Sequence, residues 1–111
     1  MDLDVDAFII LKKLKKHAIM SLVHEELTAT IIGVFYDVYN KLGYGFLESV
    51  YENAMMIELE KIGLGVEQQV PIKIFYDKKN VGNFFADILV ENAVILELKA
   101  VSDITLSLIH I

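Results

Sequence analysis

Apolar residues recur at helical spacing through the N-terminal half of the chain. From residue 21 to residue 42 they return every three or four positions, and the pattern ends at the glycine-rich "GYG" of residues 43–45. Ser21 is placed to cap this helix, with acidic residues in the turns that follow. A second helix is predicted from Leu47 to Gly63, with an apolar face made of Leu47, Val50, Ala54 and Ile57.

The residues before this region also show helical spacing, from Leu3 to Ala18. We therefore expect residues 1–20 to form a helical appendage and residues 21–111 to form the domain proper. The lysine-rich "LKKLKK" within the appendage is expected to lie on a solvated helix face.

From Val66 onwards the periodicity changes to that of strands. "VEQQVPIKIFY" alternates and is rich in β-forming residues, and Pro71 suggests an edge or a bulge. A turn is predicted at residues 77–80, followed by strands at 81–90 and 93–101 around the Glu91-Asn92 turn. The tail "TLSLIHI" is compatible with a strand or a short helix. The predicted fold class is α/β in the α+β sense, with three helices followed by three antiparallel strands.

Three charged residues, Asp87, Glu97 and Lys99, lie inside the apolar strand segments rather than at their ends. Burial of an ionised side chain is costly unless the charge is paired or binds a metal. Antiparallel pairing about the turn would give partner numbers that sum to 183 or 184, which places Asp87 close to Glu97. Neighbouring carboxylates repel each other unless a cation such as Mg²⁺ lies between them. Lys99 could then hold an attacking water or offset charge in the transition state.

A simpler interpretation of these residues is open. Glu97 and Lys99 could form an exposed pair on a one-sided sheet, with Asp87 at a strand end, and the pattern alone favours this alternative. The three histidines are dispersed and show no metal-ligand spacing, so we expect surface or capping roles for His17, His24 and His110.

Composition narrows the possible functions. The chain has 111 residues, a net charge of −6, and only lysines among its ten basic residues. This argues against a strong non-specific nucleic-acid binder and against a reader of base sequence, so any contact with nucleic acid is expected to be weak. The absence of cysteine fits a reducing cytoplasm, the predicted location, and no apolar run has the length of a membrane span.

A second motif lies in "GFLESVYENA", residues 45–54. Glu48 falls in the first turn of the second predicted helix, and Tyr51 follows one turn later on the same face. Taken alone, Glu48 could simply favour the helix dipole.

Together, "LGYGFLESVYENAM" and "ADILVENAVILELKAV" resemble the GxxExxY proteins, a branch of the PD-(D/E)XK nuclease-like superfamily. The resemblance extends from His24 to Asp103. It implies a restriction-endonuclease-like core, in which a helix leads into a three-stranded antiparallel section. By position, Asp87 matches the metal-binding aspartate, Glu97 and Lys99 match the E-x-K motif, and Glu48 matches the glutamate of the preceding helix.

The resemblance implies a Mg²⁺- or Mn²⁺-dependent nuclease that hydrolyses phosphodiester bonds. Asp87, Glu97 and the Leu98 carbonyl would hold the ion, Glu48 would support it, and Lys99 would position the nucleophile. The alternative is an inactive nuclease-fold protein that acts as an interaction or oligomerisation module, which the acidic composition favours.

The chain departs from the family pattern in two places. It has Tyr39 and Tyr44 where the family usually has His and Pro. After Asp103 the family continues into a helix and a strand, so we expect this chain to be truncated and one sheet edge to be bare. A bare edge would favour self-association.

Overall fold

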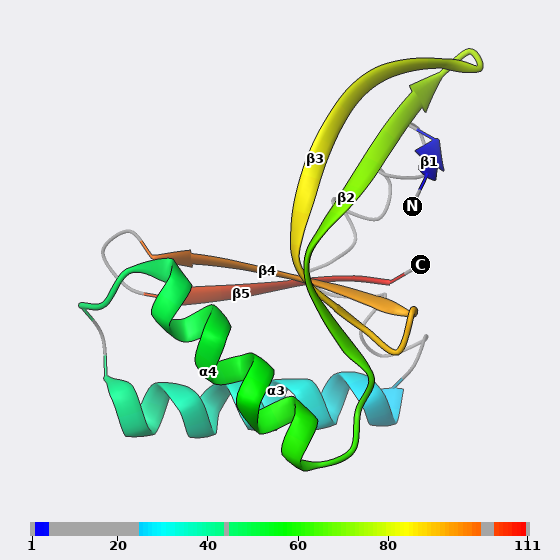
Figure 1. The fold of residues 1–111 in the computed structure, drawn as a ribbon. Coiled ribbons are helices and arrows are strands. Elements are labelled where there is room, and N and C mark those ends of the chain that lie inside the picture. The colour runs from blue at the N-terminus through cyan, green and yellow to red at the C-terminus, as the bar shows by residue number, and fades with distance from the viewer. Residues whose placement is uncertain (1, 5–24, 44, 101–103, 111) are drawn as a thin grey trace.

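The computed structural model describes residues 2–4, 25–43, 45–100 and 104–110. Among these residues, β1 is followed by two helices and then by strands β2 to β5, and the five strands form one sheet in the order β1-β2-β3-β4-β5 (Figure 1). The elements in chain order are β1 (Asp2–Asp4), α3 (Glu25–Leu42), α4 (Glu48–Lys61), β2 (Val66–Tyr76), β3 (Lys79–Val90), β4 (Val94–Ala100) and β5 (Ile104–His110). The predicted order of helices followed by antiparallel strands is confirmed, and the fold is α+β.

Both predicted helices are present, but α4 buries a different face from the one expected. Leu47 and Ile57, two members of the predicted apolar face, are 77 % and 57 % exposed. The buried apolar stripe is instead Tyr51, Met55 and Leu59, at four-residue spacing. The prediction failed because it followed the aliphatic residues, whereas a tyrosine whose hydroxyl has hydrogen-bond partners can also be buried. No helix in the described ranges is long and apolar enough to cross a membrane.

The sheet has more strands than the three predicted. Residues 104–110, for which strand and helix were both open, form β5, which pairs antiparallel with β4 from Val94↔His110 to Ala100↔Ile104. The edge of β4 that was expected to be bare is therefore covered. The sheet edge is β5 itself, and self-association through that edge stays a prediction.

At the other edge, β1 pairs in parallel with β2 at Lys73–Phe75. A helix is therefore the wrong prediction for residues 2–4, because the backbone there extends beside an existing strand. The rest of the predicted appendage, residues 5–20, lies outside the described residues, as do Ser21, His24, Tyr44 and Asp103.

The hairpin connections lie close to their predicted positions. Two residues, Asp77 and Lys78, link β2 to β3, and both have positive φ as a tight two-residue hairpin requires. β3 therefore begins two residues earlier than expected. The β3–β4 register runs from Val90↔Val94 to Ile88↔Leu96, so the predicted sum of 184 is confirmed.

Two apolar clusters lie on different sides of the sheet. The larger one joins α3 and α4 to the even-numbered residues of β4, among them Val94, Leu96 and Leu98. The smaller one contains Ile72, Ala86, Leu89, Ile95 and Ile109. Because side chains alternate along a strand, Glu97 and Lys99 leave β4 on the side of Ile95, away from the helices.

The β2–β3 hairpin bends away from the rest of the sheet. Its ladder pairs Gln68 with Ile88 and Val70 with Ala86 but lacks a pair at Gln69 and Asp87, and Gln69 has a φ of 53°. Beyond this point the hairpin rises from the side of the sheet opposite the helices (Figure 1). We call this part of the hairpin, residues 70–86, the arm. As β3 turns into the arm it leaves β4, and the β3–β4 ladder ends at Ile88↔Leu96.

Candidate functional site

The edge of β4 beyond Leu96 is open on the side of β3, and two carboxylates occupy it. The Leu98 backbone N–H donates a hydrogen bond to Asp87 Oδ2 at 2.7 Å. The Ala100 N–H donates to Glu48 Oε1 at 2.9 Å. Residues two apart on a strand are separated by about 6.6 Å. A carboxylate from β3 and one from α4 therefore lie side by side along this edge, each in the place of a missing strand partner.

A backbone oxygen lies between these two carboxylates. The N–H and C=O of one residue in an antiparallel strand point towards the same neighbour. Because the Leu98 N–H faces the open edge, the Leu98 carbonyl faces it too, between the amides bound by Asp87 and Glu48. The structure thus brings together three of the predicted site residues, Asp87, Leu98 and Glu48, on one strand edge.

The other two predicted residues lie on the face of β4 rather than at its edge. Glu97 is opposite Ser107 and partly exposed, and Lys99 is opposite Thr105 and exposed. No ion pair joins them, because the two ion pairs in the described ranges both involve Glu58, with Lys41 and Lys61. The simpler interpretation predicted an exposed Glu97–Lys99 pair. The two side chains are at least partly exposed, but no ion pair forms between them in the described ranges.

Within residues 2–4, 25–43, 45–100 and 104–110, no group of three or more acidic or histidine side chains is close enough together to hold a metal ion. The candidate donor set in this structure consists of two carboxylates and a backbone carbonyl. Glu97 flanks Leu98 in sequence but points from the sheet face.

Behind the two carboxylates lies a polar group that sequence analysis did not find. Glu52, one turn after Glu48 on α4, is only 8 % exposed. It accepts hydrogen bonds from Gln69 Nε2 at 2.8 Å and from Gln68 Nε2. Gln69 Nε2 also lies 3.5 Å from Asp87 Oδ1, so this amide connects the buried carboxylate of α4 to the candidate site. The four-residue spacing of Glu48 and Glu52 was the available signal, since it puts both on one helix face.

Gln69 holds this position in a left-handed backbone conformation, with a φ of 53°. Such a conformation costs a non-glycine residue of order 1–2 kcal/mol and persists only when its surroundings fix it. Here the hydrogen bond to Glu52 and the bend between sheet and arm fix it.

The Gly45-x-x-Glu48-x-x-Tyr51 motif is explained by the connection between α3 and α4. The Tyr51 hydroxyl donates to the Gly43 carbonyl at 2.7 Å and accepts a weaker hydrogen bond from the Phe46 N–H at 3.5 Å. Gly45 has a φ of 104°, which favours glycine. Tyr51 thereby ties down the loop that starts α4, and the first residue of that helix is Glu48.

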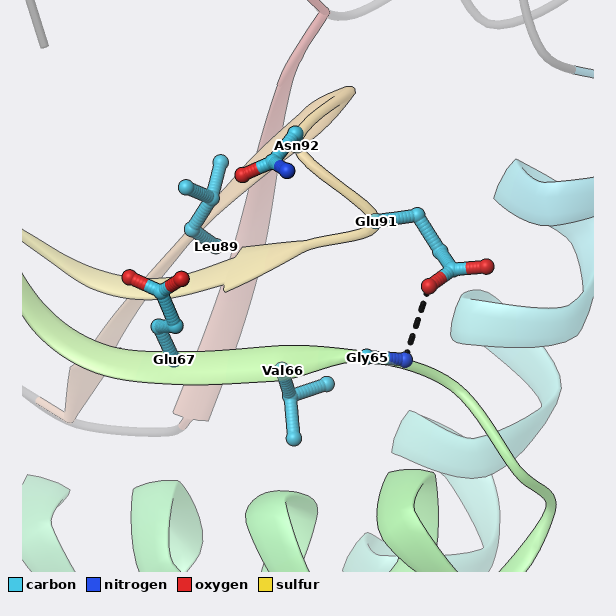
Figure 2. A pocket seen from close by; sticks show the side chains of 6 residues that line it. All are labelled: Gly65, Val66, Glu67, Leu89, Glu91 and Asn92. Atoms are coloured by element: carbon cyan, nitrogen blue, oxygen red, sulfur yellow. Dashed lines mark hydrogen bonds between the residues drawn. The ribbon is translucent and has the colours of Figure 1, made fainter.

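A hollow at the β3–β4 turn, where β3 ends, does not contain the predicted site. It is lined by Gly65, Val66, Glu67, Leu89, Glu91 and Asn92 (Figure 2). In it, Glu91 Oε2 accepts a hydrogen bond from the Gly65 N–H, and the Glu91 N–H donates to the Gly65 carbonyl, both at 2.8 Å. Glu91 thus fastens the start of β2 to the β3–β4 turn, which is a structural role.

Comparison with known proteins decides the family. The family model of the PD-(D/E)XK nuclease superfamily matches residues 25–109, which include α3, α4 and strands β2 to β5. The chain belongs to the PD-(D/E)XK nuclease superfamily. The superfamily domain therefore spans both helices and the antiparallel sheet, and the predicted restriction-endonuclease-like fold agrees with it. The narrower resemblance to the GxxExxY branch stays a prediction. Neither the curated proteins nor the solved structures give a match.

Proposed function

We propose that this PD-(D/E)XK protein is a nuclease that hydrolyses phosphodiester bonds of nucleic acid with the help of Mg²⁺ or Mn²⁺. The observation that carries the proposal is the placement of Asp87, Glu48 and the Leu98 carbonyl on the one open edge of β4. A nuclease of this superfamily is the activity that best fits such an arrangement of oxygen donors.

The donor set suits a hard divalent cation. Mg²⁺ binds one or two carboxylates together with waters and substrate phosphate oxygens, and it does not need an all-protein cage. Glu48 uses Oε1 for the strand, and among the described residues nothing hydrogen-bonds to its second oxygen. A bound ion would supply Lewis-acid stabilisation of the phosphate and a more acidic water.

The remaining residues complete the proposed site from the sheet face. Glu97 and Lys99 flank Leu98 in sequence, so both side chains start within one residue of the proposed ligand carbonyl. We assign Glu97 as a further ligand, and Lys99, which has no ion-pair partner in the described ranges, as the group that holds the attacking water. Gln69 and Glu52 act as positioning residues, because their hydrogen bonds fix the Asp87 carboxylate from behind.

The test is calorimetric titration of Mg²⁺ and Mn²⁺ into the wild type and Asp87→Asn. Asparagine keeps an oxygen that can accept the Leu98 N–H, so the strand contact survives while the charge is lost. We expect metal binding and a metal-induced rise in melting temperature in the wild type only, with stability in the absence of metal unchanged or raised by the substitution.

The matched control is Glu91→Gln, because Glu91 also accepts a backbone N–H but lies in the hollow at the β3–β4 turn and is not among the proposed ligands. This variant should bind metal like the wild type. An equal rise in melting temperature for wild type and Asp87→Asn would mean that the ions act non-specifically, and the proposed site would be wrong.

The second candidate function is a non-catalytic interaction module that keeps the nuclease fold. The absence of a three-acid cluster among the described residues and the net charge of −6 favour it. It predicts no metal binding and no cleavage of a labelled oligonucleotide by the wild type, whereas the nuclease predicts metal-dependent cleavage that Asp87→Asn abolishes.

A further inference from the structure

The arm exposes apolar and basic side chains on one of its two faces. The ladder pairs Pro71 with Phe85 and Lys73 with Asn83, and all four residues are exposed. The opposite face, which includes Val70, Ile72, Phe84 and Ala86, belongs to the smaller apolar cluster with Leu89, Ile95 and Ile109. One face of the arm thus packs into the smaller apolar cluster at the bend, and the other is exposed.

Phe85 stands out on the exposed face because it is 62 % exposed and lies two residues before Asp87 in the sequence. It precedes Asp87 by two residues on β3, a distance of about 6.6 Å along the backbone. A large aromatic ring open to solvent at this position has no role in the core.

The arm also differs in charge from the rest of the chain. Lys73, Lys78 and Lys79 against Asp77 give residues 70–86 a net charge of +2 in a chain of net charge −6. Asp2 and Asp4 of β1 pair beside Lys73 and Phe75 and offset this charge there, so the excess of basic charge is at the tip. Lys78 and Lys79 lie at the tip, beyond the Lys73–Phe75 span that pairs with β1. Lys79 is eight residues from Asp87 along β3, a path of about 26 Å.

We propose that the arm binds single-stranded nucleic acid, with Phe85 of its exposed face stacked on an unpaired base near Asp87 and with Lys78 and Lys79 of the tip on phosphates. Proteins that bind single strands combine aromatic stacking with a basic track along the backbone, which is the combination found here. The chain has no arginine for reading base pairs, and stacked pairs in a duplex offer no base face to Phe85. The inference rests on the proposed nuclease function and names its substrate class.

The first experiment uses Phe85→Trp, because the chain contains no tryptophan and the new residue would be the sole tryptophan reporter. The protein is titrated, in the presence of a metal chelator, with a 12-nucleotide oligo(dT), with oligo(rU), and with a DNA hairpin duplex. We expect both single strands to quench the tryptophan and the duplex to leave it unchanged. Tyr36→Trp is the control, since Tyr36 is similarly exposed, at 59 %, but lies on α3.

The second experiment measures affinity by fluorescence anisotropy of labelled oligo(dT). Phe85→Ser should weaken binding by at least five-fold, in line with the contribution of one stacked base. Lys78→Gln with Lys79→Gln should reduce the slope of log affinity against log salt by about 1.4, from two phosphate contacts to a single strand. Lys41→Gln with Lys61→Gln, on the helices, should change neither quantity.

Because binding is measured without metal, failure of the metal site and failure of the arm are distinguishable. Equal quenching of Phe85→Trp by duplex and single strand would overturn the single-strand assignment. Sedimentation that shows the wild type as a dimer and Phe85→Ser as a monomer, without loss of oligonucleotide affinity, would assign the face to contact between copies of the chain and overturn the proposal.

Discussion

Tyr51 gives the sharpest test of how the α3–α4 connection positions Glu48. The substitution Tyr51→Phe removes one hydroxyl from a side chain that is 1 % exposed and leaves its ring in place. The ring packs edge-to-face against Phe46, with centroids 6.2 Å apart, and that contact should survive. The change therefore isolates the two hydrogen bonds of the hydroxyl.

The expected loss follows from those two bonds. The bond to the Gly43 carbonyl, at 2.7 Å, is short, whereas the one from the Phe46 N–H, at 3.5 Å, is weak. Removal of one good buried hydrogen bond costs about 1–1.5 kcal/mol. For a domain of this size, that loss lowers the melting temperature by roughly 4–12 °C.

Thermal melts followed by circular dichroism would measure the effect, with Tyr36→Phe and Tyr76→Phe as controls. Both control rings are mostly exposed, and no hydroxyl hydrogen bond is found for either among the described residues. The controls should melt within about 2–4 °C of the wild type, since exposed substitutions of this kind change stability by less than ~0.5 kcal/mol. If Tyr51→Phe melts with the controls but loses metal affinity, the hydroxyl acts at the metal site and the loop-fastening role is refuted.

Two further stability predictions follow from backbone conformation. Gln69→Gly relieves the left-handed φ but removes one of the two amide donors to the buried Glu52 carboxylate, so we expect a net loss of about 1 kcal/mol in the free energy of unfolding by urea. A gain would mean that the strain outweighs the hydrogen bond. Gly45→Ala should lower the melting temperature, because the φ of 104° at this position favours glycine. Gly33→Ala should stabilise the protein by about 1 kcal/mol, because Gly33 lies within α3 and no atom is within 4 Å of the added methyl group. Shifts of the same sign in both variants would contradict this reasoning.

The helix ends and the strand register could be predicted because local chemistry determines them. Glycines end α3 and α4, and alternation together with the Glu91-Asn92 turn fixes the β3–β4 register at a sum of 184. The strand β5 could not be predicted in the same way. Its short apolar segment is compatible with a strand or with a short helix. It becomes a strand because it pairs with β4 along its full length.

The candidate site was predictable in part for a related reason. Asp87 is conspicuous as a charge inside an apolar strand, and the structure shows what offsets its cost, a hydrogen bond from the Leu98 N–H. Glu52 and Gln69 were missed because their hydrogen bond joins residues 17 positions apart and depends on a left-handed φ that a glutamine does not signal.

One feature of the backbone, the bend at Gln69 and Asp87, accounts for both the candidate metal edge and the arm. If β3 continued straight beside β4, its own carbonyls would accept the Leu98 and Ala100 N–H groups, and no carboxylate would be needed there. Because β3 turns away, Asp87 and Glu48 accept these two N–H groups, and the Leu98 carbonyl is left facing the gap. The same turn carries the arm out of the sheet on the side opposite the helices (Figure 1). Alternation along β4 directs Glu97 and Lys99 to that side as well. The open strand edge and the arm are therefore two consequences of one distortion, which explains why a strained glutamine, rather than a regular strand residue, lies between them.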